Sequence, residues 1–418
     1  MRKRTASEIW RGKMAFPTWD RVIFIDTEKT GEKPWSVQLQ YDQAEPRIAV
    51  LEAWDADIKL GILRERVKAN TLTVVHNALF DIPVLRSLGI HPTLIADTMQ
   101  MAYLLGMDMI GLKTLAYRLC SIQMREFDEV TAEATQHKAR EYLERVVGQE
   151  WDDPLPYYDF DAKGVQKVHW PQNIRKKVIA LLKKYDADPT INLHEKWYTM
   201  EKEKGRGQVE EKFGKLDRGW LCDVPREEAE EYALGDVKAT AAIFPILWPQ
   251  IQSLGLEETF WRDMGAMEMV MDMEANGCRL GIGHFHQLGE DIRVEVGKLE
   301  GELEKLAGHK VNVNSSKQVG ELMSQLEIPV ESTGAEVLDH YRHIPEVKLV
   351  QDIRGLLKLL GTYVDKFPGM VDGDLRLHTR LSMTRTDTGR LASSKPNLQN
   401  IPVRTEWGKK IRRGFVAC

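Results

Sequence analysis

Two acidic residues lie two positions apart at the end of an apolar run. Asp26 and Glu28 follow the run Val22–Ile25, which is typical of a strand covered on both faces. Because side chains alternate along a strand, both carboxylates should lie on one face. Two carboxylates aimed at one point repel each other unless a cation lies between them. The pair is therefore a candidate metal site, although most Asp-x-Glu pairs are surface charges.

Further polar residues follow a second apolar run. Asn77 and Asp81 come directly after residues 72–75, which are predicted to form another buried strand. Asp97 begins the next predicted helix. In α/β folds, ligands are bound where such strands end. These side chains are therefore expected to lie near the Asp-x-Glu pair.

A tyrosine and an aspartate occupy one face of a predicted helix much later in the chain. Tyr232 and Asp236 are four residues apart within residues 227–247, so their side chains should be neighbours. Taken singly, a tyrosine in such a helix is usually a core residue and an aspartate a surface charge. The complete ordered set is what indicates an active site.

This ordered set resembles the tyrosine-bearing branch of the Asp-Glu-Asp-Asp superfamily of 3′→5′ exonucleases. The resemblance covers residues 20–118 and 222–250 and implies cleavage of phosphodiester bonds. It implies two divalent cations, Mg²⁺ or Mn²⁺, which lie roughly 3.5–4 Å from each other. Hard oxygen ligands would hold them. The implied metal ligands are Asp26, Glu28, Asp81 and Asp236.

The resemblance also implies a role for each residue. Asp26 would bridge both cations, while Glu28 and Asp236 would complete one of them. Asp81 would hold the second cation, mostly through water. Tyr232 and Glu28 would orient the attacking water.

Three further positions complete this comparison. Asn77 matches the second motif of the superfamily. Asp97 is expected to support the metal-binding residues without binding a cation itself. Lys29 departs from the pattern, because relatives more often carry a small polar residue after the glutamate. Lys29 is expected either to lie near the scissile phosphate or to face solvent.

The order of predicted elements indicates an α/β domain followed by a mainly helical region. The exonuclease resemblance implies a ribonuclease H-like mixed sheet with flanking helices at residues 1–255. Residues 125–222 are charged and predicted to be largely helical, and we interpret them as an insertion. Beyond residue 256, apolar residues repeat at helical spacing and predict one dry stripe: Leu288, Ile292, Val296, Leu299, Leu303 and Leu306.

The C-terminal part of the sequence is basic, although the net charge of the chain is −5. Residues Arg376–Arg413 hold ten Lys/Arg and two Asp/Glu, interleaved with Gly, Ser, Asn and Gln. Such a segment suits a phosphate-binding surface. Within it, Thr384–Pro402 resembles the template-primer contact motif of family A DNA polymerases, of the bacterial and bacteriophage DNA polymerase I type.

This second resemblance implies a thumb and the start of a palm. Residues 256–370 would form the helix that leads into the palm and the thumb, and residues 371–418 the start of the palm. Arg390 would reach the minor groove at the primer end and sense pairing geometry. The positions implied to contact DNA are Asn314, Ser315, Ser316, Lys317, Arg385, Arg390, Asn397, Gln399, Asn400 and Arg404.

The family places its polymerase aspartates and its nucleotide-binding helix beyond the position of Cys418. We therefore expect this chain alone not to extend a primer, and expect a C-terminal half as a separate or spliced chain. The expected substrates are primer-template DNA and single-stranded 3′ ends. Two alternatives remain open, namely a stand-alone exoribonuclease of the ribonuclease D type and a non-catalytic scaffold half of a split polymerase.

Composition limits the setting. The sequence has no run of 18 apolar residues, so no membrane span is predicted. Its four cysteines are scattered singly, which suits a reducing cytoplasm rather than a disulfide framework. The expected location is the cytoplasm of a bacterium or of a phage-infected cell.

Overall fold

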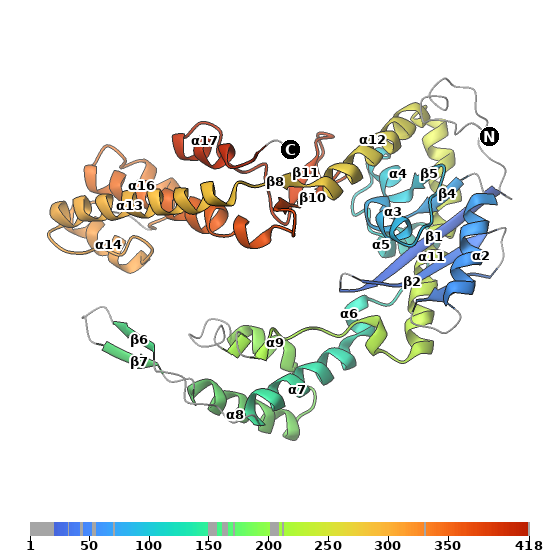
Figure 1. Cartoon of the computed structure of the whole chain (residues 1–418), viewed down its shortest axis with the longest axis horizontal. Helices are drawn as coiled ribbons and strands as arrows, with labels where there is room; N and C mark the ends of the chain where they lie inside the picture. Colours follow the sequence, from blue (N-terminus) through green and yellow to red (C-terminus); the bar gives the residue numbers. More distant parts are fainter. Residues whose placement is uncertain are drawn as a thin grey trace. The chain divides into compact units, whose positions relative to one another are not determined.

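The chain divides into two compact units, Met1–Gly265 and Ala266–Cys418 (Figure 1). The computed structural model describes residues 21–31, 33–41, 45–51, 56–69, 72–148, 157–160, 166–169, 172–200, 209–210, 213–329 and 332–416. Among the helices in these ranges, none is both long and apolar enough to cross a membrane.

A five-stranded mixed sheet forms the centre of the first unit. Its order is β3-β2-β1-β4-β5, and it confirms the predicted α/β class with a mixed sheet. β1 (Val22–Thr30), β2 (Lys33–Tyr41) and β3 (Arg47–Val50) are antiparallel neighbours, while β4 (Leu72–Val75) and β5 (Ile95–Asp97) run parallel to β1.

The strand β1 is longer than the apolar run that predicted it. Its pairing with β4 ends at Phe24, but its pairing with β2 continues to Thr30, with an irregularity between Glu28 and Lys29. Asp26 and Glu28 therefore lie within a strand that ends only at Thr30, whereas they were expected at the end of a shorter one. Pairing with β2 on one side carries the polar residues beyond the parallel part of the sheet.

Helices of the first unit surround this sheet: α2 (Ala56–Ala69), α3 (Ala78–Ser87), α4 (Thr98–Leu104), α5 (Leu112–Cys120) and α11 (Arg226–Ser253). The last of these packs on β1, β2, α4 and α5. Its buried stripe includes Ala229, Ala233 and Val237. The helix continues six residues past its predicted end, because Trp248 and Ile251 are buried as well.

The predicted insertion is largely helical and has its own core. It contains α6 (Phe127–Val130), α7 (Ala132–Gly148), α8 (Gln172–Ala187), α9 (Leu193–Thr199) and the 3-10 turn η3 (Leu221–Asp223). Buried side chains from α7, α8 and α9 pack together around Tyr142 and Trp197. A hairpin of β6 (Tyr157–Phe160) and β7 (Gln166–His169) was not expected.

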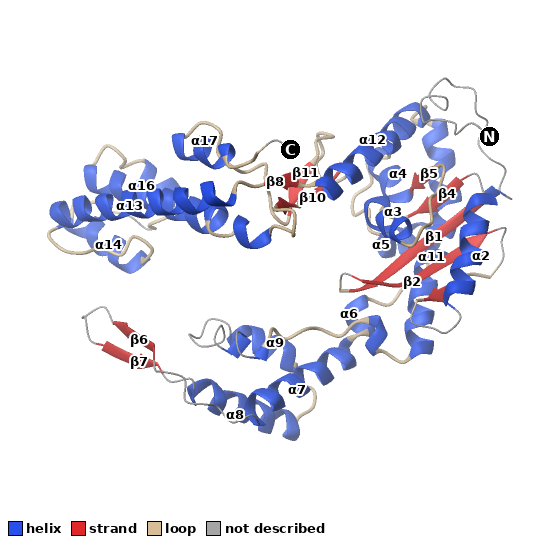
Figure 2. Ribbon diagram, in the orientation of Figure 1, coloured by secondary structure: helices blue, strands red, loops and turns tan. Residues whose placement is uncertain are grey.

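The second unit is mainly helical, with short strands (Figure 2). Its elements, in chain order after α12 (Glu257–Asn276), are β8 (Cys278–Arg279), α13 (Ile282–Ala307), α14 (Ser316–Gln325), α15 (Ala335–Asp339), α16 (Pro345–Leu359), η4 (Leu360–Val364), η5 (Phe367–Met370), β9 (Arg376–Leu377), β10 (Arg380–Ser382), β11 (Ala392–Ser394) and α17 (Glu406–Arg413).

The core of the second unit lies between α13 and α16. Leu288, Ile292, Val296 and Leu303 of the predicted stripe are buried, and Leu299 packs against them. Leu306 is 52% exposed, so its inclusion in the dry stripe was wrong. The helix ends one residue later, where Gly308 adopts a left-handed conformation.

Candidate active site

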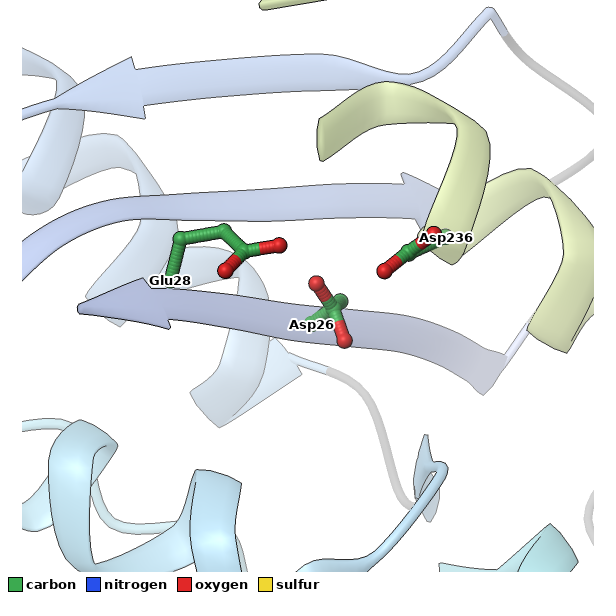
Figure 3. Close-up of side chains that lie close together, drawn as sticks. All are labelled: Asp26, Glu28 and Asp236. Carbon is green, nitrogen blue, oxygen red and sulfur yellow. The ribbon is translucent and has the colours of Figure 1, made fainter. Parts of the chain in front are cut away.

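Three carboxylates from two elements meet at one point. Asp26 and Glu28 come from β1, and Asp236 comes from α11 (Figure 3). One oxygen of each lies within 4.8 Å of the others. The period of the strand puts the first two on one face, and packing of α11 on β1 brings the third to them. Residues more than 200 positions apart therefore form one acidic cluster.

Asp81 lies beside this cluster but is not one of its three converging residues. It occupies the first turn of α3 and is buried. Its Oδ1 accepts hydrogen bonds from the backbone N–H of Thr27, at 3.1 Å, and from the Thr27 hydroxyl, at 2.7 Å. Thr27 stands between Asp26 and Glu28 in the chain. The strand that carries two of the carboxylates thus also fixes the fourth.

Asp97 holds the start of the helix that carries Asp81. Its carboxylate accepts backbone N–H bonds from Asn77 and Ala78, at 2.9 and 2.8 Å, and from Met99 at 2.8 Å. Asn77 has a φ of 77°, a left-handed conformation that asparagine tolerates better than most residues. The contacts of Asn77 and Asp97 therefore organise the turn between β4 and α3.

The carboxyl groups of the cluster resist ionisation. Burial raises the pKa of Asp26 well above its ordinary value, and the charges of Asp81, Asp236 and Glu28 raise it further. Burial, with the charges of Asp236 and Asp81, raises the pKa of Glu28 to about 8. Burial likewise raises the pKa of Asp236 to about 6, while the positive charge of Lys113 acts in the opposite direction on both.

Several oxygens of these groups have no hydrogen-bond partner. Asp26 Oδ2, Asp81 Oδ2 and Asp236 Oδ1 are buried and unpaired among the described residues. Buried polar atoms are normally satisfied, so each exception needs an explanation. A divalent cation among the carboxylates would supply both the missing partner and the missing charge. The donor set of hard oxygens fits such an ion.

Tyr232 lies one turn before Asp236 in α11 and next to the cluster. Burial raises the pKa of its phenol, with further contributions from Asp236, Glu28 and Asp26. The side chain therefore stays protonated at neutral pH. Its ring packs edge-on against Phe127, with the centroids 6.2 Å apart.

Two lysines border the acidic residues. The Nζ of Lys29 lies 5.1 Å from the ring centroid of Phe80, the residue before Asp81, in the range of a cation–π contact. Lys113, at the start of α5, donates a hydrogen bond of 3.2 Å to Tyr232 Oη. The sequence offered no signal for Lys113, because its partners lie on other elements.

The positions implied to contact DNA lie in the second unit and differ in their contacts. Arg385, Arg390 and Arg404 are exposed, and no ion pair joins them to another described residue. By contrast, Gln399 is engaged within its own loop, accepting from Ser393 N–H and donating to the Leu391 carbonyl. Its amide therefore braces the loop between β10 and α17.

The neighbouring asparagines and the start of α14 likewise include residues that are hydrogen-bonded within the fold and residues that are exposed. Asn397 Oδ1 accepts from the N–H groups of Gln399 and Asn400. Ser315 caps α14 by accepting from Gln318 N–H at 3.3 Å. Lys317 has an 87% exposed side chain, and Asn314 and Ser316 lie beside it.

Comparison with known proteins agrees with this geometry in both units. Residues 16–145 match the family described as 3′-5′ exonuclease, and residues 283–418 match DNA polymerase family A. Thermostable DNA polymerase I of Thermus aquaticus is 38% identical over 209 residues, which cover 46% of this chain and 24% of that protein. DNA polymerase I of Rhizobium leguminosarum is 34% identical over 212 residues, covering 47% of this chain and 20% of that protein.

A third relative and one solved structure extend the comparison. DNA polymerase I of Chloroflexus aurantiacus is 32% identical over 244 residues, covering 54% of this chain and 25% of its own length. The chain thus spans no more than about a quarter of these three relatives. The polymerase domain of Pol1 from M. smegmatis, in complex with DNA primer-template and dNTP, matches with a TM-score of 0.55 at 19% identity. That match covers 94% of this chain and 54% of the other, and shows a likeness in fold.

The acidic cluster on β1 and α11 lies in the unit that matches the exonucleases, and the exposed arginines lie in the unit that matches the polymerases. The chain thus carries a segment that matches the 3′–5′ exonuclease family, followed by a segment that matches DNA polymerase family A.

Proposed function

We propose that the first unit removes nucleotides one at a time from the 3′ ends of DNA, as a proofreading exonuclease. One observation carries this proposal. Carboxylates of β1 and α11 converge within 4.8 Å, and three buried oxygens around them lack any described partner. An arrangement that is repulsive by itself is explained by bound cations, which would in turn attract an anionic substrate.

We propose Asp26, Glu28, Asp81 and Asp236 as the residues that hold two divalent cations, with Asp26 shared between them. Mg²⁺ is the proposed ion, and Mn²⁺ a substitute. Bound cations would lower the pKa of the attacking water and neutralise charge on the phosphate and on the leaving oxygen.

The other residues of the site position the reactants. Tyr232 keeps its proton and can donate a hydrogen bond to the attacking water, while Glu28 can accept one from it. As the water oxygen bonds to phosphorus, the bond from phosphorus to the 3′ oxygen breaks. The water proton passes to solvent, and the 3′ oxygen of the shortened strand takes up a proton.

The test is trimming of a 5′-labelled single-stranded DNA by the full chain, with Mg²⁺ or with a chelator. Trimming should require the cation, and Asp236→Ala should reduce it at least 100-fold because a metal ligand is lost. Asp188→Ala is the matched control, since Asp188 is exposed and lies in the insertion. Undiminished trimming by Asp236→Ala would refute the proposed site.

The same assay distinguishes the alternative substrates. DNA is preferred in our proposal because residues 283–418 match a DNA polymerase family. A labelled RNA of the same sequence should be trimmed more slowly than the DNA. Faster trimming of RNA would favour an exoribonuclease, and no trimming of either strand would favour a non-catalytic scaffold.

We propose that the second unit binds primer-template DNA. Support comes from the exposed Arg385, Arg390 and Arg404 and from the M. smegmatis neighbour, which was solved with primer-template. Binding through several phosphates should weaken steeply as salt rises. Fluorescence anisotropy with a labelled primer-template measures this, and affinity that is independent of salt would contradict it.

We propose the division into exonuclease at 1–255, the helix leading into the palm and the thumb at 256–370, and the start of the palm at 371–418. Primer extension is proposed to need further polymerase-domain residues, on the same or a second polypeptide. The proposed location is the cytoplasm of a bacterial or phage-infected cell. Among the described residues, Cys120 and Cys278 are free thiols, which supports a reducing compartment.

A further inference from the structure

The ammonium group of Lys113 lies at the edge of the acidic cluster and donates three hydrogen bonds. Its Nζ donates to Tyr232 Oη at 3.2 Å, to the backbone oxygen of Arg125 at 2.6 Å and to Glu126 Oε2 at 3.3 Å. An ammonium group has three donors and no acceptor. These three contacts therefore use its full capacity, and its side chain is only 23% exposed.

The direction of the contact with Tyr232 follows from the chemistry of the two groups. Because Lys113 can only donate, the phenol oxygen accepts, and the phenol proton is left to point elsewhere. No described residue accepts that proton. The ring itself is held on one side by Phe127 and lies 4.9 Å from the Lys113 ammonium. The phenol therefore has an unused donor beside the cluster.

The anchors of Lys113 lie at the first residues of the insertion. Glu126 caps α6, and Arg125 forms an ion pair of 2.6 Å with Glu228 of α11. Lys113 therefore joins α5, the start of the insertion and the helix that carries Tyr232. An ammonium that left these anchors to contact a phosphate would have to give up one of its three bonds.

We propose that Lys113 is a positioning residue of the exonuclease, which fixes Tyr232 as a hydrogen-bond donor toward the attacking water. This inference rests on the proposed function, and it adds a residue that neither carboxylate spacing nor helix periodicity identifies. Lys113 itself does not contact the substrate. Its effect should therefore depend on the presence of the Tyr232 hydroxyl.

A double-mutant cycle tests this dependence. Trimming kinetics are measured for the wild type, Lys113→Met, Tyr232→Phe and the double variant, with Mg²⁺ in excess. Lys113→Met should lower kcat about 10- to 100-fold, the size expected for a charged hydrogen bond and proton positioning, with KM changed less than about twofold. In the Tyr232→Phe background the same substitution should reduce kcat less than about threefold.

The control is Lys138→Met. Lys138 is similarly half-buried, at 30% exposed, and forms an ion pair with Asp223 away from the cluster. This variant should trim DNA at the wild-type rate. If Lys113→Met fails to fold, Glu126→Gln takes its place, because it removes the charge from one of the three acceptors of Lys113. This variant should lower kcat in a way that also depends on Tyr232.

The outcomes separate the inference from the function beneath it. A wild type that does not trim any 3′ end refutes the proposed function. A wild type that trims, with equal losses from Lys113→Met in both tyrosine backgrounds, overturns only the inference. A rise in KM with kcat unchanged also overturns it, because that result would place Lys113 on the substrate phosphate.

Discussion

Neutralising Asp236 should stabilise the cation-free protein. Burial raises the pKa of this carboxyl to about 6, against an ordinary value of 3.8. The folded state therefore binds the proton more tightly than the unfolded state, so stability is greatest below the ordinary value and is lost as pH rises through about 6. A difference of about two units corresponds to at most about 3 kcal/mol at pH 8.

Asp236→Asn keeps the shape of the side chain and removes this penalty. Since the group is partly accessible, we expect a gain of about 1–3 kcal/mol at pH 8 in chelator. For a unit of this size the gain raises the melting temperature by about 2–6 °C. Near pH 4 the gain should almost vanish, because the wild-type carboxyl is then protonated in the folded state.

Thermal unfolding followed by circular dichroism measures both parts of this prediction. In chelator at pH 8, Asp236→Asn should melt at a higher temperature than the wild type. The control Asp188→Asn should melt at the same temperature as the wild type. Added Mg²⁺ should raise the melting temperature of the wild type, because a ligand that binds only the folded state stabilises it. The variant should show a smaller rise. A lower melting temperature for Asp236→Asn in chelator would refute the reasoning, as would an equal response to Mg²⁺.

Three other perturbations test contacts elsewhere in the fold. Thr27→Val removes the hydroxyl that donates to Asp81, so trimming at limiting Mg²⁺ should fall about tenfold; an unchanged Mg²⁺ titration would count against that contact. Hydrogen bonds to a backbone carbonyl and to Asp372 raise the pKa of His378, so the stability they add is present at low pH and is lost as pH rises through the raised pKa. Hydrogen exchange around β9, corrected for intrinsic rates, should accelerate over that range, and constant protection would contradict the assignment. Gly408→Ala places a methyl group against the backbone of the preceding loop and should destabilise the second unit by about 1–3 kcal/mol in urea unfolding. A urea midpoint equal to that of the wild type would show that the loop moves to make room for the methyl group.

Much of the candidate site was predictable because its parts obey local periodicities. Asp26 and Glu28 share a face through the alternation of a strand, and Tyr232 and Asp236 share one through the turn of a helix. The helical insertion, α13 and most of its buried stripe were visible for the same reason. A chain's local pattern reports which side chains lie on one face of an element, and these predictions needed no more than that.

Contacts between elements distant in the chain were not predictable in this way. The bond from Thr27 to Asp81 joins residues 54 apart, and the bond from Lys113 to Tyr232 joins residues 119 apart. A lone lysine near the start of a helix carries no pattern that names its partner. The extension of β1 to Thr30 depends on how far it pairs with β2, a length that the apolar run of β1 does not encode. Packing of α11 against the sheet decides which groups share one low-dielectric space, and that proximity produces the raised pKa values and the unpaired oxygens.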